Sequence, residues 1–232
     1  MPKKRKISIL PFVIIFLFLL CFLPSFLQNC EIYRKDVDKY IVYLDSDTAQ
    51  ERKQGLYYLQ RFGPVSRKAL PKIFDLLQQD KDVSVRNQAV LAIERIGLDD
   101  QSLPLARKAL KANDSYTNHV LIKSIADLGY NARSALPELI STINLYSDLT
   151  LYLETLTAIT KIAPQEDIID ELINCLNSDD KSMQIGAIIA LRDLHFNADK
   201  ALPLLKELRE RTQDRQVKIA ASETINIIEH GK

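Results

Sequence analysis

The chain has 232 residues, of which 47% are hydrophobic and 26% are charged, as in an ordinary globular protein. Four of its 31 basic residues lie at positions 3–6, which leaves 27 basic residues against 30 acidic ones in the rest of the chain. Because nucleic-acid binding usually requires a clustered basic excess, the composition argues against a nucleic-acid partner. With only six glycines and no tryptophan, the composition favours a helical protein.

The first 29 residues are typical of a signal peptide or membrane anchor. The basic positions precede an uncharged apolar stretch, residues 7–27, which is long enough to span a bilayer as a helix. Only Arg34, Lys35 and Lys39 follow closely, so we expect the N-terminus inside and residues 30–232 outside the cytoplasm, in the cell envelope. Residues 30–232 form the second predicted domain.

The fate of this segment has two open alternatives. A-x-A-like small residues, which a cleaved secretory signal requires, are missing after the apolar stretch. The sequence LQNC, residues 27–30, resembles a bacterial lipobox, with Leu27 at a favoured position and Cys30 as the lipidation candidate; Gln28 and Asn29 depart from its usual small residues. The alternative is an uncleaved anchor. Either fate attaches the chain to a membrane.

An internal repeat of about 33 residues follows, and it predicts helices. Apolar residues recur directly before the end of each copy and four residues before it, which marks one face of a helix. Fifteen residues before each end stands a residue type that caps helix N-termini by accepting a bond from a free N–H group. The copies end at Gly63, Gly97, Gly129, Ala163, His195 and Glu229, and the caps are Thr48, Asp82, Asp114, Asp148, Asp180 and Asp214.

A partner helix precedes each of these helices. The partners are predicted at residues 35–44, 66–78, 102–112, 133–145, 167–177 and 200–210. Prolines lie near the start of four of them, where the missing N–H is least harmful. The predicted fold is therefore all-α, with about six antiparallel helix pairs preceded by the N-terminal hydrophobic helix.

The repeating unit resembles the HEAT repeat, particularly the short variety named after the phycobilisome lyases. The second copy carries the resemblance best, through Asp80, Asp82, Val85, Arg86, Ala89, Ala92, Ile93 and Gly97. The resemblance extends over residues 32–230 and implies an α-solenoid whose second helices line a concave side. It also implies that Arg86 and Asp80 bridge adjacent copies. Copy one retains an Arg, Arg52, whereas Asn118, Tyr152, Gln184 and Lys218 replace it in copies three to six.

Catalytic and metal-binding patterns are missing from the sequence. The three histidines lie in different copies without close spacing, so we expect no metal site. The chain has neither a glycine-rich phosphate loop nor a G-x-S-x-G motif. Cys175 lies on an apolar helix stripe, where packing in the core is the usual role. We therefore expect a non-enzymatic protein without a cofactor.

The exposed slots of the second helices are the candidate partner-binding surface. These slots lie two residues and six residues before each copy's end. In the first half of the stack they mix apolar and cationic side chains, types that are enriched at protein interfaces. The candidates are Tyr57, Arg61, Leu91, Arg95, Lys123, Asp127 and Lys161.

The sequence thus predicts a membrane-tethered scaffold or adaptor that binds another protein on the concave face. Two alternatives stay open. One is a lyase-like or chromophore-handling activity, which only the family resemblance suggests. The other is a purely structural lipoprotein of the cell envelope.

Overall fold

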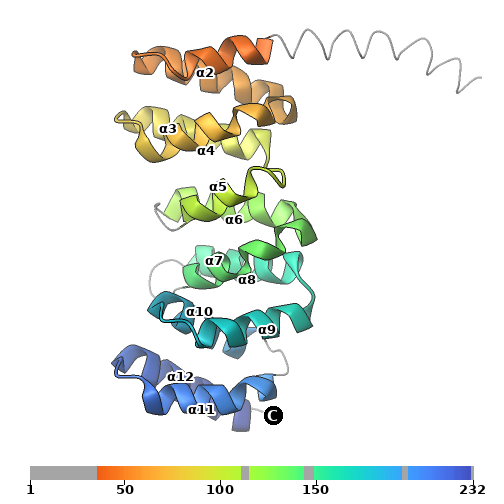
Figure 1. Cartoon of the computed structure of the whole chain (residues 1–232), viewed down its shortest axis with the longest axis vertical. Coiled ribbons are helices and arrows are strands. Elements are labelled where there is room, and N and C mark those ends of the chain that lie inside the picture. The colour runs from red at the N-terminus through yellow and green to blue at the C-terminus, as the bar shows by residue number, and fades with distance from the viewer. Residues whose placement is uncertain (1–35, 111–114, 144–148, 195–197, 231–232) are drawn as a thin grey trace, which may run out of the picture.

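The computed structural model describes residues 36–110, 115–143, 149–194 and 198–230. All secondary structure in these ranges is helical, as predicted. The helices are stacked in sequence order along the long axis of the molecule, from α2 at one end to α12 at the other (Figure 1). After the helical residues 36–43, the elements are α2 (Ala49–Phe62), η1 (Gly63–Ala69), α3 (Leu70–Gln79), α4 (Val83–Ile96), α5 (Leu103–Leu110), α6 (Ser115–Asp127), η2 (Gly129–Ala135), α7 (Leu136–Thr142), α8 (Leu149–Ile162), α9 (Gln165–Leu176), α10 (Lys181–Asp193), η3 (Ala198–Ala201), α11 (Leu202–Arg211) and α12 (Arg215–His230).

These elements form the six predicted helix pairs. The first helices are residues 36–43, α3, α5, α7, α9 and α11, and the second helices are α2, α4, α6, α8, α10 and α12. Three first helices begin two to four residues later than predicted, because the 3-10 segments η1, η2 and η3 precede α3, α7 and α11. In all three cases the α-helix begins where a proline occupies its first turn.

Helix capping fixes where the second helices begin. Four of the six predicted caps lie among the described residues, and each accepts a hydrogen bond from a backbone N–H of the first turn. The N···O distances are 3.3 Å for Thr48, 2.7 Å for Asp82, 2.8 Å for Asp180 and 2.8 Å for Asp214. The prediction is confirmed at these four positions; Asp114 and Asp148 lie outside the described residues.

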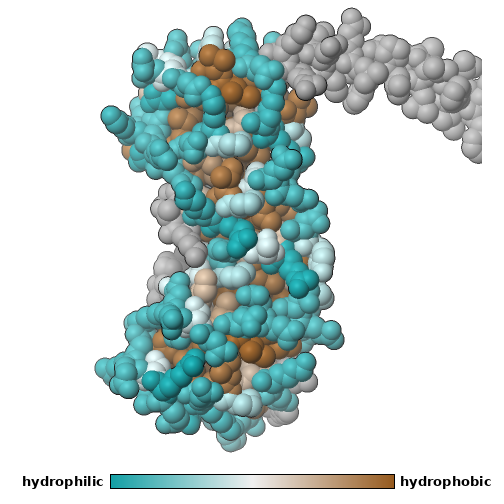
Figure 2. Space-filling view, in the orientation of Figure 1, coloured by the Kyte–Doolittle hydropathy of each residue, from teal (hydrophilic) through white to brown (hydrophobic). Residues whose placement is uncertain are grey.

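Neighbouring pairs enclose the core together. The slot four residues before each copy's end is buried in all six second helices, from Leu59 to Ile225. α2, α4, α6 and α8 pack one on the next, and α10 packs on α12. Figure 2 shows hydrophobic residues in patches along the stack, between hydrophilic side chains.

The stack departs from uniform repetition at the fifth pair. Besides its own pair partner α9, α10 packs mainly on α7 and α12, and not on α8. Gly186 permits this contact: a Cβ at this position would lie 1.9 Å from the carbonyl oxygen of Ile140 in α7. The Tyr152 hydroxyl, in the slot that holds Arg86 in copy two, donates to the carboxylate of Asp193 at the end of α10.

The bridge between the first two copies differs from the one that the resemblance implied. Arg86 donates to the backbone carbonyl oxygen of Asp80 at 2.8 Å, within its own copy, so the implied Arg86–Asp80 bridge between copies is wrong. Arg52 of the preceding copy instead donates to both carboxylate oxygens of Asp80, at 2.6 and 2.9 Å. Burial opposes ionisation of Asp80, but bonds from Arg52 and from the Asp82 N–H outweigh it and lower the pKa of the carboxyl.

The predicted N-terminal span, residues 7–27, and Cys30 lie outside the described residues. Among the helices that the structure describes, none combines the length and hydropathy that crossing a bilayer requires.

We predict that Gly186→Ala destabilises the protein by about 1–3 kcal/mol, because the added methyl group forces α7 and α10 apart. Urea unfolding followed by circular dichroism measures the change. Ser182→Ala is the control, because Ser182 is exposed on the same helix, and it should stay within about 0.5 kcal/mol of the wild type. Equal stability of the two variants would contradict the close contact.

We predict that Arg52→Ala destabilises the protein by about 3 kcal/mol at neutral pH, because it leaves the Asp80 carboxylate buried without its cation. Lys68→Ala, which removes an exposed pair with Asp38, should cost less than about 1 kcal/mol. Denaturant unfolding of the two variants gives the comparison.

The same pair predicts a pH dependence. Since the pKa of Asp80 is lowered in the folded state, its stabilisation is complete above the ordinary Asp pKa of about 3.9 and is lost as the pH falls through the folded-state value. The stability difference between wild type and Arg52→Ala should therefore shrink in acid. An unchanged difference at acid pH would show that the ion pair is not its source.

Candidate functional site

The predicted interaction residues lie on four consecutive second helices, and each is exposed. Neighbouring copies place equivalent slots on adjacent helices of the stack. The side chains are Tyr57 and Arg61 on α2, Leu91 and Arg95 on α4, Lys123 and Asp127 on α6, and Lys161 on α8.

The helices α2 and α4 are held side by side. The Gln88 side-chain amide donates to the Gln60 side-chain oxygen at 3.1 Å. A Cβ at Gly63, which ends α2 with a φ of 59°, would lie 3.7 Å from the Arg95 carbonyl oxygen. These contacts place the equivalent slots of the two helices next to each other, and we call Tyr57, Arg61, Leu91 and Arg95 the Arg61/Arg95 patch.

Charges farther along the stack compensate one another. Lys161 of α8 contacts the carboxylate of Asp127 of α6 at 2.8 Å. Lys123 of α6 lies 3.6 Å from the carboxylate of Glu94 of α4. These cross-helix pairs leave little net charge for a partner to recognise. Lys123, Asp127 and Lys161 are therefore distinct from the four residues of the Arg61/Arg95 patch.

The Arg61/Arg95 patch differs from these pairs in the surroundings of its cations. Within the described residues, neither guanidinium has a carboxylate at ion-pair distance. Arg61 lies over the Tyr57 ring, 5.8 Å from its centroid, while 46% of Tyr57 and 38% of Leu91 remain exposed. Both arginines occupy the last turn of a helix, where they also offset its negative end. The patch therefore presents two cations beside an aromatic and an aliphatic side chain.

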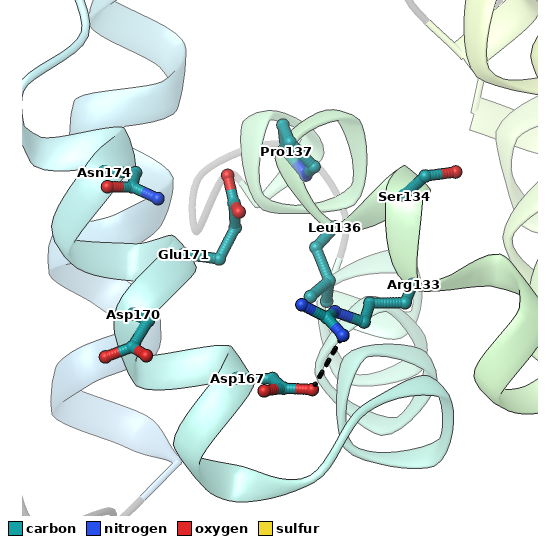
Figure 3. A pocket seen from close by; sticks show the side chains of 8 residues that line it. All are labelled: Arg133, Ser134, Leu136, Pro137, Asp167, Asp170, Glu171 and Asn174. Carbon is teal, nitrogen blue, oxygen red and sulfur yellow. Dashed lines mark ion pairs between the residues drawn. The ribbon is translucent and has the colours of Figure 1, made fainter.

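A second feature, which the sequence analysis missed, is a cavity of about 470 Å³ between η2, α7 and α9. Arg133 of η2 reaches across it to the Asp167 carboxylate at 3.4 Å. Figure 3 shows this pair meeting, with the Asp170 carboxylate pointing away from it. A hydrogen bond with Tyr130 and the charge of Asp167 raise the pKa of Arg133. The acidic residues of α9 lie close together in sequence, but only the packing of α9 against α7 brings them next to Arg133.

The described residues offer little for catalysis. His119 pairs with Glu154, and His230 lies near the backbone carbonyl oxygen of Asn226, whereas His195 is outside the described residues. Cys175 is buried, and burial raises the pKa of its thiol to about 12, which disfavours the reactive thiolate. No group of three potential metal ligands occurs in the described part of the chain.

Comparisons with known proteins agree with the repeat. A family model described as HEAT repeats matches residues 137–226, which span α7 to most of α12. Over those residues the predicted resemblance to HEAT repeats is confirmed. A comparison with curated proteins returned no match.

Two solved structures are similar at low identity. An archaeal HEAT-like repeats protein from Thermococcus onnurineus NA1 is 14% identical, with 88% of this chain and 92% of that chain covered and a TM-score of 0.44. The complex of CpcE and CpcF of phycocyanin lyase from Nostoc sp. PCC7120 contains a chain that is 15% identical, with 83% and 94% covered and a TM-score of 0.40.

Proposed function

We propose that the protein is a non-enzymatic scaffold that binds another protein on the exposed face of its second helices. The observation that carries the proposal is the Arg61/Arg95 patch, where exposed apolar side chains lie beside two cations that no carboxylate of the described residues neutralises. Helical repeat stacks commonly present extended binding surfaces of this kind.

The chemistry of the patch favours an acidic segment of the partner. Tyr and Arg are enriched among the residues that contribute most to protein interfaces. Two guanidiniums that are unpaired within the described residues can donate hydrogen bonds to carboxylates in a fixed geometry, and they also accelerate the encounter with an acidic surface. The binding should therefore weaken as the salt concentration rises.

We further propose that the scaffold is attached to a membrane. Its support is the apolar stretch at residues 7–27 with the basic residues before it, and the lipobox-like residues that end at Cys30. Attached there, by a lipid or by an uncleaved helix, residues 30–232 would lie in the cell envelope and hold a partner close to the bilayer.

We predict that Arg61→Glu combined with Arg95→Glu lowers partner capture at least about tenfold, the loss of about 1.4 kcal/mol of binding free energy. The measurement is quantitative pull-down from solubilised membranes with the full chain. Lys108→Glu combined with Lys200→Glu is the control: both lysines are exposed and outside the patch, and the change in charge is the same. Circular dichroism verifies that both variants are folded.

Three outcomes separate the proposal from its alternatives. Capture that is sensitive to salt and to the patch variant, but not to the control variant, supports it. Capture that the patch variant leaves intact contradicts it. Failure to capture any protein specifically also contradicts it and favours the purely structural alternative.

We predict that the mature chain begins at a lipid-modified Cys30. Mass spectrometry of the N-terminal peptide from membranes gives the result directly. A chain that retains Met1 would instead identify the uncleaved anchor. A mature chain that begins at an unmodified residue after position 27 would contradict both forms of attachment.

A further inference from the structure

We propose that the groove between α10 and α12 is a second docking site, which binds an amphipathic helix of a partner protein that carries aliphatic residues beside a lysine or arginine. The groove has a volume of about 420 Å³, and the last residues of α7 contribute to its lining. None of its residues belongs to the Arg61/Arg95 patch, so the proposal does not depend on that patch.

Aliphatic side chains from three helices form the apolar part of the groove. Ile143, which follows α7, and Ile189 of α10 are buried, Ile185 of α10 is half-buried, and Ile219 of α12 is 47% exposed. Within α10 the two isoleucines are four residues apart, one helical turn, so they follow the helix axis. A row of aliphatic residues along a helix of the partner could pack into this groove against the isoleucines.

The close contact between α7 and α10 explains why residues at the end of α7 line this groove. Because Gly186 lets α10 approach the Ile140 backbone closely, the end of α7 lies beside α10. In a uniform stack α8 would contact α10 instead. The groove is thus a consequence of the irregular fifth pair, and the repeat pattern alone does not predict it.

The charges around the groove favour a partner helix with a basic side chain. Arg192 and Glu223 are the charged residues of the lining. Arg192 is already neutralised, because it donates to both carboxylate oxygens of Asp193, at 2.5 and 2.9 Å. Glu223 is exposed and has no ion-pair partner within the described residues. The groove therefore retains one negative charge at its edge, which a lysine or arginine of the partner would compensate.

Fluorescence anisotropy with a labelled helical peptide tests the proposal. The probe peptide has leucines along one face and lysines beside them, and the full chain is kept in detergent. We expect Ile219→Ser to weaken binding at least about tenfold, whereas Ile227→Ser should leave it unchanged. Ile227 is the matched control, since it is 46% exposed on the same helix and lies outside the groove lining.

Charge reversal tests the selectivity. Against a second peptide in which glutamates replace the lysines, the wild type should prefer the lysine peptide at least about fivefold. Glu223→Lys should reverse this preference. Circular dichroism checks that the variants are folded, and the reversal itself requires a folded groove, since a variant that merely unfolds loses both peptides.

Several results would overturn the proposal. One is binding of the lysine peptide that Ile219→Ser and Glu223→Lys leave intact, and another is no binding at all. Sedimentation that shows a dimer of the wild type and a monomer of Ile219→Ser would identify a second copy as the occupant instead. Arg61→Glu with Arg95→Glu should still bind the peptide, so failure of the groove proposal and failure of the proposed scaffold function are distinguishable.

Discussion

Two helices of seven to sixteen residues cannot enclose their own apolar stripes, and the structure depends on this constraint. Each pair leaves one side of its stripe open, and only the next pair along the stack covers it. The result is the burial of the same slot in every second helix, from Leu59 in α2 to Ile225 in α12. Because every pair is covered by its neighbours, stability is distributed along the stack and no single pair is an independent core.

The same constraint determines where partners could bind. Side chains that do not face a neighbouring helix point to solvent, and their charges are either paired across helices or left open. Lys161 and Asp127 are paired, whereas the guanidiniums of the Arg61/Arg95 patch have no carboxylate partner among the residues that the structure describes. At the fifth pair, the shift of α10 onto α7 brings Ile143 beside the isoleucines of α10 and α12. The regular part of the stack thus presents the basic Arg61/Arg95 patch, and the irregular fifth pair presents a groove with an acidic edge.

Much of the fold follows from local sequence signals. Capping residues and the apolar stripe predicted where second helices begin and which side is buried, because both signals act within one or two turns of a helix. The contacts between copies were harder to predict. Arg52 and Arg86 occupy equivalent slots, yet only the first reaches the Asp80 carboxylate, since that depends on the turn of the next copy. The placement of α10 was not predicted either. A glycine such as Gly186 indicates that another helix packs closely, but the sequence does not specify which helix it is.

Hydrogen exchange of Ile93→Asp measures the dependence between pairs most directly. Ile93 is fully buried in α4, so the substitution should accelerate amide exchange in α4 and in the helices packed on it, α2, α3 and α6. The effect should decline along the stack, with α11 and α12 close to the wild type. Acceleration confined to α4 would mean that each pair is stable by itself. Equal acceleration in every helix would mean one global core; either result would contradict the account.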